Sequence, residues 1–178
     1  MDKTAHPWTV PVSVEDIPDT GLHMDIEAPA AIRPTLAAFA GVNALPQLTA
    51  AFDLTKSGAR VHVVGRVTAT VGQTCVVTLE PIENRVEEAV DLVFAPQAGP
   101  VDPDAGGKAA KADETLPEPL IGGVLDLGAV ATEFLLLGID PYPRKPDAQF
   151  TPPARGDDGA HPFAALAALK NRPGGGQA

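Results

Sequence analysis

The chain has 178 residues, a formal net charge of −10 at pH 7 and a single cysteine. Its length suits one domain with tails. The negative charge argues against tight, non-specific binding of RNA or DNA, because such binding needs an excess of Lys and Arg on one face. No apolar run reaches the ~20 residues that span a bilayer, and the N-terminus lacks a signal-peptide pattern. With the lone Cys75, these features predict a protein of the reducing cytoplasm without membrane contact.

The N-terminal part predicts short strands and one helix. Prolines within residues 5–14 restrict that alternating stretch to an edge strand. Residues 22–27 alternate between apolar and polar side chains and predict a second strand. A helix over residues 30–40 is expected to stop at Gly41, with Pro34 in its first turn.

A long antiparallel hairpin is the centre of the predicted fold. A third strand over residues 48–54 is closed by a turn at 56–58, and the strongest period-two pattern then begins at Val61. The strand that begins there is expected to turn its apolar side toward the core, and its polar face carries His62, Arg66, Thr68 and Thr70. Gly65 and Gly72 are expected bulge or bend sites. The return strand covers residues 82–94.

The remainder of the chain predicts a loop, a capped helix and a tail. Residues 97–118 are rich in Pro, Gly, Ala and acids, which predicts a mobile acidic loop. The next helix should begin at the cap Asp126 and end at a left-handed Gly138. Its apolar stripe comprises Leu127, Val130, Ala131, Phe134 and Leu135. Prolines then keep the chain extended. Residues 151–178 are expected to be mostly disordered, with a short helix over 162–170.

Together these patterns predict one α+β domain over residues 1–150. Its core is a curved, mainly antiparallel sheet with two packed helices, and closure of the sheet into a partial barrel is left open. The strand order and the oligomeric state are not specified by the pattern.

Cys75 is best explained as a small, buried residue. It shares the inward parity of the strand with Val77 and Leu79. A nucleophile would need a basic activator beside it, and a zinc site would need about four ligands, which the sequence does not supply as spaced pairs. We therefore predict no metal and no cofactor.

Carboxylates crowd the return strand and raise the alternative of an enzyme. Such residues could hold a divalent cation in a hydrolase or nuclease. A solvated face that discourages edge pairing is the preferred interpretation, and no catalytic residue is predicted. The residues concerned are Glu80, Glu83, Glu87, Glu88 and Asp91.

Two small groups of residues are candidate contacts for RNA or for a protein partner. His62 and Arg66 share the polar face of the long strand. Tyr142, Arg144 and Lys145 lie in the proline-spaced tail, where a pre-ordered backbone loses little entropy on binding.

Two blocks resemble a known family in their residues and their order. VGQTCVVTLEPIENRVEEAVDLVFAP and LDLGAVATEFLLLGIDPYPRKP, followed by HPFAALAALK, resemble the YceD-like family, and most closely its alphaproteobacterial branch. Many relatives carry Cys-x-Arg-Cys-Leu where this chain has Cys75 to Leu79 without the arginine or the second cysteine. A metal or disulfide role at that motif is therefore not expected here.

The resemblance implies a bacterial, non-enzymatic factor that supports accumulation or maturation of large-subunit (23S) ribosomal RNA. Because the chain is acidic, we expect it to act on the large-subunit precursor through a basic ribosomal protein, through local RNA contacts, or both. DNA is not an expected partner. The alternatives are the metal-dependent enzyme described above and a general protein-binding adaptor.

Overall fold

The computed structural model describes residues 6–96 and 117–150. The predicted loop at 97–118 lies mostly outside these ranges, and the predicted tail at 151–178 with its helix at 162–170 lies wholly outside them. In chain order the elements are β1 (Pro11–Ser13), a 3₁₀ turn (Val14–Asp16), β2 (Leu22–Glu27), α1 (Arg33–Ala40), β3 (Ala44–Ser57), β4 (Arg60–Thr74), β5 (Pro81–Pro96), β6 (Glu118–Leu120), β7 (Val124–Asp126) and α2 (Leu127–Gly138).

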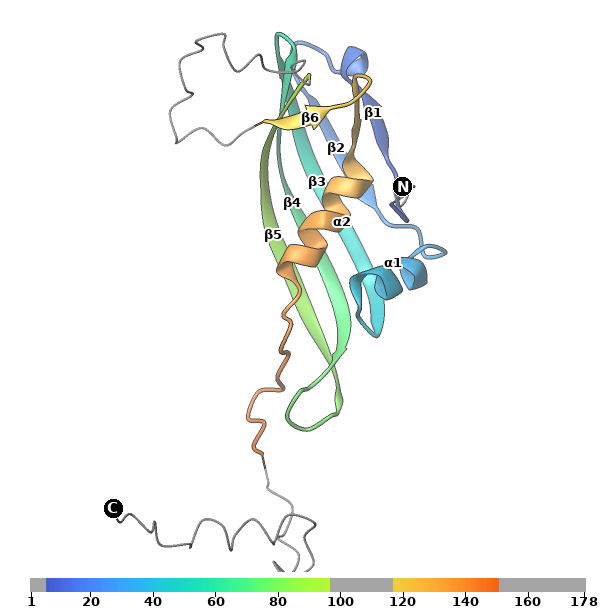
Figure 1. Ribbon diagram of the computed structural model, residues 1–178, viewed down its shortest axis with the longest axis vertical. Helices are drawn as coiled ribbons and strands as arrows, with labels where there is room; N and C mark the ends of the chain where they lie inside the picture. Colours follow the sequence, from blue (N-terminus) through green and yellow to red (C-terminus); the bar gives the residue numbers. More distant parts are fainter. Residues whose placement is uncertain (1–5, 97–116, 151–178) are drawn as a thin grey trace, which may run out of the picture.

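The main sheet has five strands in the order β2-β3-β4-β5-β6. All neighbours are antiparallel except β5 and β6, which are parallel. A separate two-stranded sheet joins β1 to β7. Figure 1 shows α1 and α2 on the same side of the long strands, so no helix within residues 6–96 and 117–150 covers the opposite side of the sheet, here called the uncovered side. The fold is therefore α+β as predicted, and the sheet is open rather than closed into a barrel.

The predicted hairpin is confirmed as β4 and β5. Their register runs without a shift from Val61 opposite Phe94 to Thr74 opposite Pro81. The inward side chains of β4 at positions 61, 63, 67, 69 and 71 are fully buried. They form one core with Phe52 of β3, Leu36 of α1 and Leu135 of α2. Burial of one face against two helices explains the period of two in the sequence.

The two glycines of β4 do not form bulges in that strand. The one register shift of β3 against β4 falls between Ala44 and Gln47, so the extra residue lies on β3. Gly65 instead allows close packing, because a Cβ atom there would lie 2.3 Å from the Ala51 carbonyl oxygen and 2.6 Å from Cδ1 of Phe52. No bulge forms at Gly65, so that part of the prediction was wrong, and the alternative of a bend stays a prediction. The missing side chain serves close packing there.

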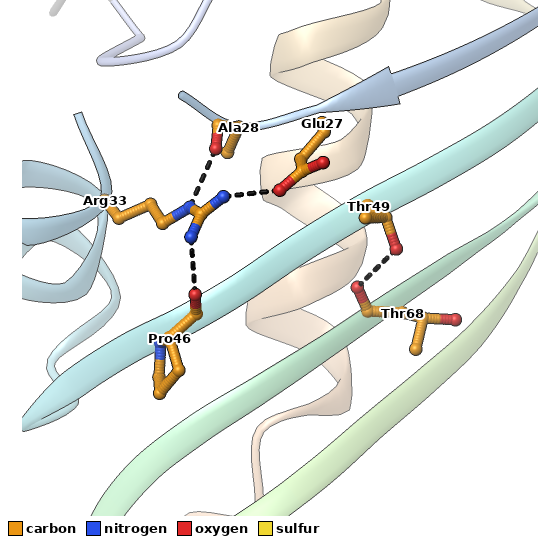
Figure 2. Close-up of polar contacts among 6 residues, drawn as sticks. All are labelled: Glu27, Ala28, Arg33, Pro46, Thr49 and Thr68. Carbon is orange, nitrogen blue, oxygen red and sulfur yellow. Dashed lines mark hydrogen bonds and ion pairs between the residues drawn. The ribbon is translucent and has the colours of Figure 1, made fainter. Parts of the chain in front are cut away.

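Helix α1 follows its predicted signals. Pro34 lies in the first turn, and Gly41 adopts a left-handed φ of 69° after the last helical residue. Figure 2 shows how Arg33 fixes the start of the helix: its guanidinium donates to the Ala28 carbonyl at 2.8 Å, to the Pro46 carbonyl at 2.7 Å and to the Glu27 carboxylate at 2.5 Å. This side chain therefore ties α1 to the end of β2 and to β3.

Helix α2 begins as predicted and ends differently. The Asp126 carboxylate accepts from the backbone N–H groups of Gly128 and Ala129, and also from Val10 at 2.8 Å. Gly138 was expected in a left-handed conformation, but it is the last helical residue and is followed by an extended Ile139. Glycine is favoured at this position by close packing, because a Cβ atom there would lie 2.4 Å from Cγ1 of Val86.

Other strand boundaries also differ from the prediction. The edge strand expected at 5–14 is reduced to β1, and the strand expected at 48–54 extends over the whole of β3. Strands β6 and β7 are three residues each and were not predicted, because so short a run carries no measurable period. In the described part of the chain, no helix is long and apolar enough to cross a membrane.

Candidate interaction surfaces

His62 and Arg66 lie on the uncovered side of the sheet, as predicted, and both face carboxylates. Nε2 of His62 lies 2.7 Å from Oδ1 of Asp91, and the Arg66 guanidinium pairs with Glu87. Because β5 supplies a carboxylate to each of these side chains, neither is free of a nearby negative charge when it approaches an RNA phosphate. The sequence placed them on the correct face without showing that they are paired.

The whole uncovered side, here called the outer sheet face, is acidic. It carries the outward residues of β2 to β5, where three arginines oppose six acids. The arginines are Arg60, Arg66 and Arg85, and the acids are Asp25, Glu27, Asp53, Glu83, Glu87 and Asp91. The His23 ring lies 2.7 Å from Asp53, and this hydrogen bond and charge raise the pKa of His23, with a smaller contribution from Asp25. A hollow of about 450 Å³ lies between β2, β3 and β4, lined in part by Asp25, Glu27 and Arg66. Such a face complements basic partners rather than nucleic acid.

The second candidate surface forms where the tail meets the end of the β4–β5 hairpin. Tail residues 139–146 run past the connecting loop at 75–80 (Figure 1). Nε2 of Gln73 donates to the Asp140 carbonyl at 2.8 Å, and the Val76 N–H donates to the Pro143 carbonyl at 2.9 Å. These bonds hold the tail in place, and Pro143 is buried there. The predicted extended tail is thus ordered by its contacts as well as by its prolines.

Cys75 and Lys145 complete this attachment. The Cys75 Sγ atom accepts from the Lys145 N–H at 3.3 Å and from the Thr78 N–H at 3.4 Å. Nζ of Lys145 lies 2.9 Å from Oε2 of Glu80. Donation by the Lys145 backbone, then by Thr78, lowers the pKa of the Cys75 thiol to about 6. Cys75 is buried as predicted, but it lies outside the main core cluster and acts as a hydrogen-bond acceptor.

Exposed apolar and basic side chains surround this attachment. We call Val76, Leu79, Tyr142 and Arg144 the tip surface. Leu79 is 76% exposed and Tyr142 is 71% exposed, and Arg144 is also exposed. The inward orientation expected for Leu79 was wrong, because strand β4 ends at Thr74 and the loop that follows does not keep the strand parity.

Leu79 also has an unusual backbone conformation, with φ of 60°. A bulky residue in the left-handed region costs roughly 1–2 kcal/mol, and Leu79 gains little burial in return. We therefore expect Leu79→Gly to raise the free energy of unfolding by about 1 kcal/mol, measured by urea denaturation. A loss of stability would show instead that the exposed leucine contributes to packing, and Val76→Ala is the matched truncation at a residue with ordinary φ.

The structure separates the two groups of candidate contacts. Arg66 and the end of the hairpin at Cys75 are nine residues apart along β4 and its extension, which corresponds to about 30 Å. His62 and Arg66 therefore belong to the outer sheet face, whereas Tyr142, Arg144 and Lys145 belong to the hairpin end. One compact ligand cannot contact both groups.

The strand carboxylates do not converge. Glu83, Glu87 and Asp91 repeat every four residues on one side of β5, so neighbours are about 13 Å apart. Glu88 has the opposite parity and lies close to Gly138 of α2. Within residues 6–96 and 117–150, no group of three or more His, Cys, Asp or Glu side chains is placed to hold a metal ion. The arrangement gives no support to the metal-dependent enzyme.

The fold and these surfaces define a small α+β protein with an open acidic sheet face and a tail docked on its central hairpin. The family comparison is more specific. The family model described as large ribosomal RNA subunit accumulation protein YceD matches residues 63–170, and the chain belongs to that family. No curated protein and no solved structure matches the chain. The matched range includes most of β4 and the whole of β5, α2 and the docked tail. The assignment to an alphaproteobacterial branch stays a prediction.

Proposed function

We propose that this protein is a non-enzymatic cytoplasmic factor that supports the accumulation or maturation of 23S ribosomal RNA during assembly of the large subunit. Membership of the YceD family carries the proposal, because that family is described by ribosomal RNA accumulation and not by a reaction. The acidic outer sheet face supports action through a basic protein of the precursor particle.

The tip surface is the candidate for a direct contact with the precursor. Tyr142 and Arg144 combine an exposed ring with an exposed guanidinium, a pair that can stack on an unpaired base and bind a phosphate. The tail that presents them is fixed before binding by Gln73, Val76 and Cys75. Lys145 is already paired with Glu80, so we assign it to holding the tail rather than to the contact.

The test uses cells that lack the protein, complemented with wild-type protein or with variants. Sucrose gradients and the ratio of 23S to 16S ribosomal RNA are measured. We expect the deletion to lower this ratio selectively and wild-type protein to be found in large-subunit precursor fractions. Normal profiles, with the protein absent from all ribosomal fractions, would overturn the proposed function.

Variants in the same cells test the tip surface separately. Arg144→Glu should lower co-sedimentation with precursors several-fold without altering the fold. The matched control is Arg60→Glu, which makes the same charge change at an exposed residue in the first position of β4, at the other end of the hairpin. Equal co-sedimentation of the two variants would remove Arg144 from the contact while leaving the overall function intact.

A further inference from the structure

Among the residues that the structure describes, most of strand β5 has a free edge. β5 pairs with β4 over its whole length, but β6 pairs with it only at Phe94 to Pro96. No strand in the described part of the chain pairs with the remaining edge at 81–93, and Figure 1 shows β5 as the border of the sheet below β6. A free edge of this length is a template for an additional strand.

The register identifies the backbone groups on this edge. The Cys75 N–H donates to the Glu80 carbonyl, and in an antiparallel pair the hydrogen-bonded residues then recur at every second position. Even-numbered residues of β5 therefore bond to β4. The N–H and C=O groups of the odd-numbered residues from 83 to 93 point away from β4, and their side chains lie on the outer sheet face.

An apolar groove lies beside this edge on the inner side of the sheet. It has a volume of about 700 Å³ and is lined by residues of β5, β6, the β6–β7 connection and α2. Its apolar lining includes Leu92 and Phe94 of β5 with Phe134 and Leu137 of α2. Leu137 is 75% exposed, so this part of the groove is open to a partner.

Acidic side chains border the edge on both sides. On the outer face, β5 presents Glu83, Glu87 and Asp91 together with Arg85. Glu87 is shared between Arg66 and Arg85, and Asp91 contacts His62. On the inner side, Glu118 and Glu133 line the groove. Two copies of this edge would place like charges together, whereas a basic strand would be attracted.

We propose that the free edge of β5 binds an extended, basic segment of another protein as an added strand. In such a strand, apolar side chains enter the groove beside α2, and the alternate lysines or arginines face the carboxylates of the outer sheet face. Binding of a basic strand at this edge does not depend on the proposed function. Only the identification of that strand with a protein of the large-subunit precursor rests on it.

The decisive variant is Ala89→Pro, tested on the full chain. Ala89 is exposed and lies in the middle of the free edge. Proline there removes an outward N–H and leaves the bonds to β4 in place. Ala89→Thr is the matched control, because it keeps the N–H and adds a strand-favouring side chain. The probe is a fluorescein-labelled 11-residue peptide of alternating lysine and valine, and its affinity is measured by anisotropy.

We expect wild type and Ala89→Thr to bind this peptide equally and Ala89→Pro to bind it about tenfold more weakly, because backbone hydrogen bonds to the probe are lost. An alternating glutamate–valine peptide should not bind. Hydrogen exchange should show protection of odd-numbered amides between 83 and 93 when the lysine peptide is bound. Exchange of the even-numbered amides checks that Ala89→Pro retains the β4–β5 ladder.

A second pair of variants tests the groove independently. Leu137→Ser should weaken binding several-fold, whereas Leu136→Ser, an exposed residue of α2 outside the groove, should not. Equal binding by wild type, Ala89→Pro and Leu137→Ser would overturn the added strand and leave attraction by charge alone. Polyuridine RNA that competes for the edge as well as the unlabelled lysine peptide does would overturn the proposal in favour of RNA as the ligand. A dimer of the wild-type protein that Ala89→Pro dissociates would overturn it in favour of a second copy of this chain. None of these binding results depends on the ribosomal RNA phenotype. The added-strand proposal and the proposed function can therefore be contradicted independently of each other.

Discussion

Gly65→Val is expected to lower the free energy of unfolding by about 3 kcal/mol, at the upper end of what overpacking usually costs. The inward position of Gly65 lies opposite Phe52 in the register of β3 and β4. A Cβ atom would lie 2.3 Å from the Ala51 carbonyl oxygen and 2.6 Å from the Phe52 ring. A backbone oxygen cannot rotate away as a flexible side chain can, so the two central strands would have to separate. Urea denaturation followed by circular dichroism measures the loss.

Gly72→Ala is the matched control for this effect. Gly72 is on the same strand, but its Cβ atom would meet the Ala44 side chain at 3.1 Å, next to the irregular stretch of β3 where the backbone can adjust. We expect a loss below about 1 kcal/mol for this control. A Gly65→Val protein as stable as wild type would mean that β3 and β4 are less closely packed at this point than the structure shows.

The elements that the sequence predicted best are those with a local signal. The alternation of β4 can be read from consecutive residues, although its cause is burial of one face in a core shared with the helices. The start of α2 has a local cause as well, because Asp126 bonds to N–H groups two and three residues ahead. The open sheet could not be distinguished from a partial barrel, because closure depends on the pairing of distant strands.

The candidate contacts show the same limit. The polar face of β4 was predictable, but the pairing of His62 with Asp91 and of Arg66 with Glu87 depends on the register of β5. The docking of the tail links Cys75 to Lys145, which are 70 residues apart. No periodicity reports a contact of that kind. The free edge of β5 was equally hidden, since the sequence did not reveal that β6 would cover only three residues of it.

The Cys75 thiol is expected to titrate with a pKa of about 6 in the folded protein, against roughly 8.5 in an unfolded chain. At a given pH the ratio of thiolate to thiol is then on the order of 100-fold higher in the folded state. Absorbance at 240 nm measures the thiolate directly. Cys75→Ser supplies the baseline, and the same protein unfolded in guanidinium chloride supplies the reference titration. A folded-state midpoint near 8.5 would contradict the role of the two N–H donors.

The lowered pKa also fixes the sign of a stability change. A group whose pKa is depressed by folding stabilises the folded state fully above its unfolded pKa and ceases to do so as the pH falls through its folded pKa. The contribution of Cys75 should therefore grow between pH 6 and about pH 8.5. His23 acts in the opposite sense, because its pKa is raised, so the comparison is made in a His23→Gln background. In that background, the difference in urea midpoint between Cys75 and Cys75→Ser should rise with pH. Sγ accepts the Lys145 N–H, so the stabilisation of the thiolate should also slow hydrogen exchange of that amide, relative to its intrinsic rate, as the pH rises. Such a result would link the ionisation of the buried Cys75 thiol to the docking of the tail that presents Tyr142 and Arg144.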